Sequence, residues 1–243
     1  MSASTTDPGD ADDIDPRGVG VGPWPGPWPN DDRFDPALLE TGDRRNVVDR
    51  YRYWRREAIV ADLDMRRHDF HVAIENWQYD MNIGTVVRNA NAFLAREVHV
   101  IGRRRWNRRG AMVTDRYQHV RHHDTIEEFV AWAHESRLRV VGIDNLPGAN
   151  ALESTDLPRR CVLLFGQEGP GLSEIARLAC DDVFSIVQFG STRSINAGVA
   201  SGIAMHAWIR THVVASTDDT SGAASAPGAW GDGPSADAPH EAT

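Results

Sequence analysis

The sequence predicts an α/β domain with a mostly parallel sheet flanked by helices. Two observations support this fold class. Short apolar runs that read as buried strands alternate with longer amphipathic stretches typical of helices. A glycine-rich loop at residues 166–171 directly follows one of these runs. Because parallel α/β proteins bind ligands at the carboxyl ends of their strands, this loop is the predicted binding site.

The 243-residue chain is expected to have disordered ends. Residues 1–43 hold ten acidic and two basic residues, and residues 213–243 hold five acidic and no basic ones. Such stretches cannot bury enough apolar surface to offset their ordering entropy. We therefore predict a disordered, Pro/Gly-rich leader over residues 1–43 and a disordered tail over residues 215–243. One folded domain is expected over residues 69–214.

The formal net charge of −9 conceals an uneven distribution of charge. Residues 44–123 carry 17 Arg against 9 acidic residues, whereas residues 124–212 carry 7 Arg against 11 acidic residues. All 26 basic residues are Arg, which we attribute to codon bias, so the clustering carries the argument. A basic region within an acidic protein suggests a polyanion as partner.

A basic helical extension is predicted over residues 44–68. Arginines surround apolar residues that recur near helical spacing within residues 46–61: Val47, Val48, Tyr51, Trp54 and Ala58. The apolar stripe suggests packing, and the arginines suit a nucleic-acid backbone. Before this extension, Trp24 and Trp28 lie in a repeated Pro-Trp-Pro unit of polyproline type, which either docks on a surface or has no contact.

The main domain is expected to begin with a strand at residues 70–74 and a helix at 82–93. The later strands are expected at residues 98–101, 138–143, 161–165 and 183–187, and the later helices at 125–136, 173–179 and 196–212. The turn after the first strand, residues 75–81, contains no glycine. This argues against a dinucleotide-binding Rossmann domain, and the sequence has no Gly-Lys-Ser/Thr phosphate loop.

An arginine-rich loop follows the strand at residues 98–101. Five arginines surround a tryptophan there: Arg103, Arg104, Arg105, Trp106, Arg108 and Arg109. Arginines supply phosphate contacts, and an exposed aromatic ring supplies a stacking face for bases. We predict that this arginine loop binds nucleic acid.

Cysteine, histidine and hydropathy patterns limit the other possibilities. Cys161 and Cys180 fit small buried apolar side chains in a reducing compartment. No metal site is expected, because the clustered histidines do not form a Cys/His ligand pattern: His119, His122, His123 and His134. No signal peptide and no apolar run of about twenty residues is found, so we expect a cytoplasmic protein without membrane contact.

Three segments taken together resemble the SpoU/TrmH branch of the SPOUT RNA methyltransferases. They are residues 82–93, which include Asn82 and Arg88, the loop at residues 165–173, and residues 185–200. Their order and spacing make the combination specific, and the resemblance covers about residues 69–212. The sequence departs from the family at Val187-Gln188, where Pro-Met is usual, and at Ile195, where Leu is usual.

The resemblance implies a C-terminal trefoil knot, a homodimer and S-adenosylmethionine as cofactor. The implied reaction is methylation of a ribose 2'-hydroxyl in tRNA or rRNA, so RNA is the expected partner of the arginine loop. The implied cofactor-binding residues are Gly166, Gly171, Ile186, Ile195 and Asn196. The implied catalytic residues are Arg88, Asn82, Glu168, Ser194 and Asn196.

The role of Arg88 and the reaction itself each have alternatives. The family often assigns the general base to the counterpart of Arg88, but a guanidinium stays protonated in proteins. An electrostatic clamp on phosphate and developing alkoxide is physically simpler. The departure at Val187-Gln188 favours, as an alternative, an RNA-binding or RNA-assembly protein that retains the fold without catalysis. A SPOUT enzyme that methylates a base is a third hypothesis.

Overall fold

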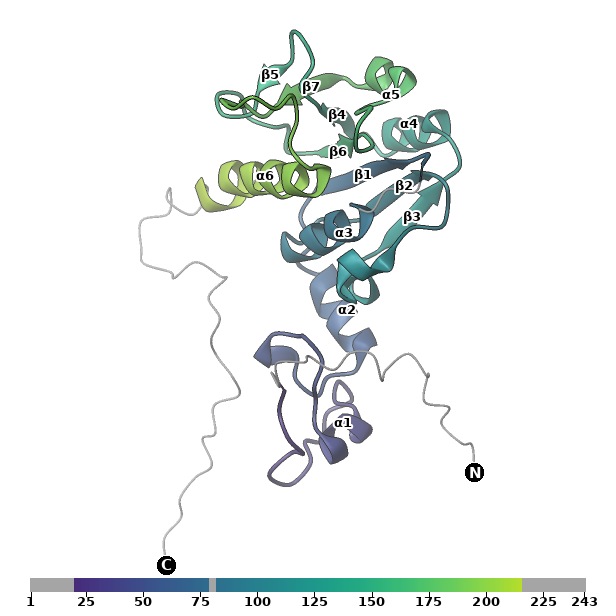
Figure 1. Cartoon of the computed structure of the whole chain (residues 1–243). Helices are drawn as coiled ribbons and strands as arrows, with labels where there is room; N and C mark the ends of the chain where they lie inside the picture. The colour runs from purple at the N-terminus through teal and green to yellow at the C-terminus, as the bar shows by residue number, and fades with distance from the viewer. Residues whose placement is uncertain (1–19, 79–81, 216–243) are drawn as a thin grey trace, which may run out of the picture. The chain divides into compact units, whose positions relative to one another are not determined.

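The structure is a computed structural model that describes residues 20–78 and 82–215 (Figure 1). The chain divides into two units, with the boundary between Ala61 and Asp62. Most of the predicted acidic tail, residues 216–243, and the first part of the predicted leader, residues 1–19, lie outside the described residues.

The N-terminal unit contains a short helix, α1 (Pro36–Thr41), and a 3-10 helix, η2 (Asp49–Tyr51). The Asp35 side chain caps α1 by accepting a hydrogen bond from the backbone of Ala37. Trp24 packs edge-on against Phe34 and Tyr53, with ring centroids 5.8 and 5.2 Å apart. The expectation of disorder is therefore wrong for residues 20–43, because their aromatic side chains share a small core with the segment that follows.

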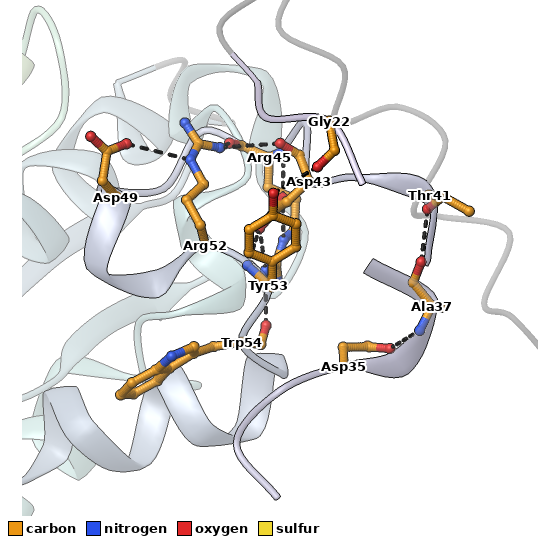
Figure 2. A network of polar contacts seen from close by, with 10 residues as sticks. All are labelled: Gly22, Asp35, Ala37, Thr41, Asp43, Arg45, Asp49, Arg52, Tyr53 and Trp54. Atoms are coloured by element: carbon orange, nitrogen blue, oxygen red, sulfur yellow. Dashed lines mark hydrogen bonds and ion pairs between the residues drawn. The ribbon is translucent and has the colours of Figure 1, made fainter. Parts of the chain in front are cut away.

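A buried ion pair holds this unit together (Figure 2). The Asp43 carboxylate is fully buried and lies 2.7 Å from the guanidinium of Arg45. The backbone of Tyr53 donates a further hydrogen bond to Asp43, at 2.8 Å, and the guanidinium of Arg52 donates to the carbonyl of Arg45. Burial acts to raise the pKa of Asp43, but the hydrogen bonds and charge of Arg45 outweigh it and leave this pKa below its ordinary value.

The predicted basic helix begins later than expected. Only the 3-10 turn η2 forms in its first half, and α2 (Arg56–Asp64) begins ten residues after Asn46. The reason lies at Tyr53, whose φ of 64° is left-handed and incompatible with a continuous right-handed helix. The buried pairing of Asp43 with the Tyr53 backbone fixes this conformation.

The second unit is built on a seven-stranded sheet in the order β3-β2-β1-β6-β4-β7-β5, with every pair parallel. The strands are β1 (Phe70–Asn76), β2 (Val98–Gly102), β3 (Val120–His123), β4 (Arg139–Ile143), β5 (Asn150–Ala151), β6 (Cys161–Phe165) and β7 (Asp182–Ser185). The predicted parallel α/β fold is confirmed, while β3 and β5 were not expected. Strand β1 is paired with β2 on one side and β6 on the other, and nearly all of it is buried.

Helices cover both faces of this sheet (Figure 1). On one face, α3 (Ile83–Ala92) and α6 (Ala197–Ile209) contribute to a core that includes Phe70, Val72 and Trp208. On the other face, α4 (Ile126–Glu135) and α5 (Glu174–Ala179) pack on Ala73 and Val162. Alternate residues of β1 thus point to opposite faces, as strand geometry requires. A π-helix, η5 (Arg210–Val214), continues α6. No helix within the described residues is long and apolar enough to cross a membrane.

Candidate active site

A pocket of about 360 Å³ lies at the carboxyl ends of β4, β6 and β7. The loops that follow these three strands supply most of its wall, together with the start of α6. The structure brings seven of the predicted site residues to this one pocket: Gly166, Glu168, Gly171, Ile186, Ser194, Ile195 and Asn196. Apolar side chains of Ile143 and Phe165 complete the wall at the strand ends.

The glycine-rich loop is a tight turn closed by its own backbone. Gln167 and Gly171 exchange two backbone hydrogen bonds, of 3.1 and 3.0 Å. Gly171 has a φ of +73°, and a Cβ atom on Gly166 would lie 2.0 Å from the carbonyl carbon of Gly171. Only glycine fits position 166 without a rearrangement of the loop. Asp144, after β4, fixes the far end of the turn by accepting a 2.9 Å hydrogen bond from the Leu172 backbone.

A chain of side-chain hydrogen bonds joins the three predicted motifs. Asn82 Nδ2, at the N-terminus of α3, donates to Glu168 Oε2 at 2.9 Å. Asn196 Nδ2 in turn donates to Asn82 Oδ1 at 2.8 Å. Asn196 also caps α6, since its Oδ1 accepts from the Val199 backbone at 3.2 Å. These bonds fix the orientation of both asparagine amides at the edge of the pocket.

Arg88 and Ser194 do not take part in this chain of hydrogen bonds. Arg88 is exposed on α3, is not among the pocket-lining residues, and has no hydrogen bond or ion pair with any residue in the described part of the chain. Ser194 lines the pocket and is exposed. The structure thus assembles Asn82, Glu168 and Asn196, and leaves the guanidinium of Arg88 available to a ligand.

The arginine loop follows the carboxyl end of β2, at the same edge of the sheet as the pocket. Its five arginines are exposed, whereas Trp106 is half-buried and packs against the core beneath α3. The Arg108 guanidinium lies over the Trp106 ring, 5.6 Å from its centroid. A Cβ atom on Gly84 would lie only 2.7 Å from the backbone nitrogen of Ala111, so the loop backbone runs directly along the first turn of α3.

Polar residues at the end of β1 support the arginine loop and the glycine-rich loop. They were not among the site residues predicted from the sequence. Asn76 Nδ2 donates to the carbonyls of Arg103 and Arg105, at 2.6 and 2.9 Å. The carboxylate of Glu75 is fully buried and accepts hydrogen bonds from the Trp77 indole and from the Ser173 backbone, at 2.7 and 2.8 Å. Glu75 and Asn76 could have been found from the sequence, because polar residues at the end of a buried apolar strand need hydrogen-bond partners nearby.

One buried polar atom of the pocket has no hydrogen-bond partner among the described residues. Gln188 lines the pocket, and its Oε1 atom is buried without a hydrogen bond from any described residue. A buried acceptor of this kind is costly unless a ligand or water donates to it. The pocket therefore combines apolar walls with an acceptor suited to an amino or hydroxyl group of a ligand.

The two cysteines do not take part in this site. Both thiols are free, and burial raises the pKa of Cys161 and of Cys180 to about 12. They are apolar packing residues, as the sequence suggested.

A parallel α/β sheet with a ligand-sized pocket at its carboxyl edge, closed by a glycine-rich turn, is typical of α/β domains that bind small molecules. The model of the SpoU rRNA methylase family matches residues 69–206, and the chain belongs to this family. The resemblance found in the sequence is thereby confirmed. Methyltransferases of this family use S-adenosylmethionine.

The curated relatives of this chain are described as tRNA/rRNA methyltransferases. An uncharacterized tRNA/rRNA methyltransferase of Mycobacterium leprae is 33% identical over 141 residues, which cover 55% of this chain and 45% of that protein. A counterpart of Mycobacterium avium is 34% identical over 141 residues, with the same coverage. The match thus spans less than half the length of these relatives.

Solved structures share the fold. The SpoU methyltransferase AviRb from Streptomyces viridochromogenes, in complex with AdoMet, has a TM-score of 0.55 at 23% identity and covers 71% of this chain and 65% of its own. A structure described as giving insights into the 2-OH methylation of C/U34 on tRNA has a TM-score of 0.51 at 27% identity, covering 59% of this chain and 95% of its own.

Proposed function

We propose that this protein transfers a methyl group from S-adenosylmethionine to a ribose 2'-hydroxyl in structured RNA, either tRNA or rRNA. The observation that carries the proposal is the Glu168–Asn82–Asn196 chain of hydrogen bonds beside the pocket, which joins three segments far apart in sequence. Membership of the SpoU rRNA methylase family supports it, as does the similarity to a structure concerned with 2-OH methylation of tRNA.

The pocket residues fit the proposed cofactor. Ile186 and Ile195 offer apolar contacts to its adenosine and methionine parts, and Gly166 and Gly171 let the backbone come close to it. Gln188 Oε1 is placed to accept a hydrogen bond from an amino or hydroxyl group of the nucleoside. When bound, the cofactor supplies an electrophilic methyl group on a sulfonium ion.

The residues around the pocket would position the ribose. Asn82 and Asn196, held in one orientation by their mutual hydrogen bond, present polar atoms at fixed places beside the methyl donor. Arg88 would hold the neighbouring phosphate and stabilise the alkoxide that develops on the 2'-oxygen as the hydroxyl proton passes to water. The methyl group would take the place of that proton, and the sulfur of the cofactor would leave as a neutral thioether. The exposed arginine loop would bind the RNA backbone at the same edge of the sheet.

We further propose the homodimer and the C-terminal trefoil knot that the family resemblance implies. Exposed apolar residues after β7 and on α6 support the dimer: Val187, Phe189, Val199 and Ile203, of which Phe189 is 95% exposed. Large apolar side chains that are exposed on a single chain are often covered at a protein interface. Sedimentation of the full chain should give the mass of two copies, and a monomer at all concentrations would contradict the dimer.

The test of the reaction is Arg88→Ala, compared with Arg177→Ala, a change at another exposed helical arginine. Methyl transfer is measured with tritiated cofactor on total RNA, and cofactor binding by calorimetry. We expect Arg88→Ala to abolish transfer while cofactor binding and the melting temperature are retained, and Arg177→Ala to behave as the wild type. Full activity of Arg88→Ala would contradict the proposed reaction, in which Arg88 acts at the ribose. Nuclease digestion then shows whether the methyl group lies on ribose or base.

The departure at Val187-Gln188 favours one alternative, an RNA-binding protein that retains the fold without catalysis. In that case calorimetry would detect no cofactor binding at millimolar concentration, while RNA binding would persist. Cofactor binding together with transfer would exclude this alternative.

A further inference from the structure

Three histidines from adjacent strands form a hydrogen-bonded row on the sheet face covered by α4. His71 Nδ1 of β1 lies 3.1 Å from His99 Nε2 of β2, and His99 Nδ1 lies 3.0 Å from His123 Nε2 of β3. The Trp132 ring of α4 packs on all three imidazoles, with centroid distances of 5.2, 4.0 and 5.7 Å. None of these residues lines the proposed cofactor pocket.

The histidine row is largely withdrawn from water. His99 is fully buried, and burial lowers the pKa of His71 to about 4. Burial also holds the pKa of His99 well below its ordinary value. An imidazole that is uncharged keeps one ring nitrogen with a lone pair, which is the form that binds metal ions.

A carboxylate approaches this row where His71 and His99 meet. Glu97 Oε2 lies 3.7 Å from His99 Nε2, and ligand atoms of His71, Glu97 and His99 all lie within 4.8 Å of one another. Arg121 approaches the other oxygen of Glu97, at 3.9 Å, and its positive charge would compete with a bound cation. The sequence does not suggest this group, because its members come from separate strands and lack the spacing of a ligand motif.

We propose that His71, Glu97 and His99 form a site for a divalent transition metal ion of the zinc type. Tetrahedral zinc, with bonds of about 2.0–2.1 Å, separates its ligand atoms by about 3.3 Å. The separations of 3.1 and 3.7 Å bracket that value. Two imidazoles and one carboxylate are a ligand set that zinc accepts, with water in the fourth position. The metal ion would take the place of the proton between His71 Nδ1 and His99 Nε2, and neutral His71 would then carry its proton on Nε2.

The surroundings of His99 favour this role. To bind metal through Nε2, His99 must carry its proton on Nδ1 and donate it to His123 Nε2. The proton of His123 then lies on Nδ1, which is buried, has no hydrogen bond from the described residues, and is 3.9 Å from Glu128 Oε1. The hydrogen bond to His123 would thus fix the tautomer and the ring orientation of His99, as outer-shell partners do for metal-binding histidines in many proteins.

The test uses the full chain, purified without a histidine tag, and titrates it with Zn²⁺ by calorimetry and with Co²⁺ by visible absorption. We expect one ion per chain, with the d–d bands of tetrahedral cobalt. His71→Gln and Glu97→Gln should each weaken Zn²⁺ binding at least about tenfold, because the change of an outer-shell partner alone costs about 10- to 100-fold. His134→Gln, which changes an exposed histidine of α4, is the matched control and should bind as the wild type does.

Thermal unfolding shows whether a variant has lost the site or the fold. Zn²⁺ should raise the melting temperature of the wild type and of His134→Gln, because a ligand that binds the folded state stabilises it. At the same Zn²⁺ concentration it should raise the melting temperature of a folded His71→Gln variant clearly less. Equal Zn²⁺ affinity in His71→Gln and His134→Gln, or no saturable binding to the wild type, would overturn the proposal.

Discussion

Asn196 Nδ2 donates a 2.8 Å hydrogen bond to Asn82 Oδ1, although the two residues are 114 positions apart in the chain. Asn82→Ala removes this bond and the one to Glu168. A lost hydrogen bond to a charged group costs about 1.5–3 kcal/mol, so we expect methyl transfer to fall about 10- to 150-fold. The rate under saturating cofactor is the measurement.

The coupling of the two asparagines is tested by a double-mutant cycle. Asn196→Ala alone should slow transfer, and the double variant should be less impaired than the product of the single effects, because the pair acts as one unit. Strict additivity would show that the two amides act independently.

Gln188→Met should have opposite effects on stability and on cofactor affinity. Its buried Oε1 atom has no hydrogen bond from the described residues, so its removal should raise the stability of the cofactor-free protein by about 1 kcal/mol. If the cofactor donates to this oxygen, its affinity should fall about fivefold, as one hydrogen bond implies. Melting curves and calorimetry measure the two effects. An unchanged or higher affinity would place the donor elsewhere.

Arg104→Glu combined with Arg105→Glu should weaken RNA binding and reduce its salt dependence. Each phosphate contact contributes about 0.7–0.9 to the slope of log K against log salt, so the slope should shrink by about 1–2. The control is Arg159→Glu with Arg160→Glu, the same charge change at two exposed residues that precede β6. If both double variants bind RNA alike across a salt series, the arginine loop is not the binding surface.

Acid should loosen the N-terminal unit through Asp43. Since the pKa of Asp43 is lowered in the folded protein, its contribution to stability is complete above its ordinary pKa and is lost as the pH falls through the lowered value. Asp43→Asn should already destabilise the unit at pH 7, by about 3 kcal/mol, because it breaks a buried pair. Cleavage by a protease within residues 20–61, followed across pH, measures this. Asp49→Asn, at a side chain that is 76% exposed, should have little effect.

The sequence predicted the strands whose side chains are buried on both faces, and these form the centre of the sheet. The apolar runs of β1, β2, β4 and β6 leave little alternative to a buried strand. Strand β3 escaped prediction because its residues, Val-Arg-His-His, lack an apolar run. His123 is buried because His99 and Trp132 pack against it, and a linear pattern cannot show this.

The sequence predicted which residues form the candidate site, but not which hydrogen bonds join them. The glycine loop and the segment around Asn196 could be assigned to one edge of the sheet by strand direction. Which amide bonds to which carboxylate depends on tertiary structure, and so do the supporting roles of Glu75 and Asn76. The N-terminal unit was missed because Trp24 and Phe34 are too few to predict a core until Tyr53 joins them.

Strand β1 lies between β2 and β6, and nearly all of it is buried. Its amide protons can therefore exchange with solvent deuterium only when the whole second unit opens. Their exchange rates would report the global free energy of unfolding of that unit, while the amides of the arginine loop report local opening. A single deuterium-exchange experiment could thus separate a ligand that tightens one loop from a ligand that stabilises the entire sheet.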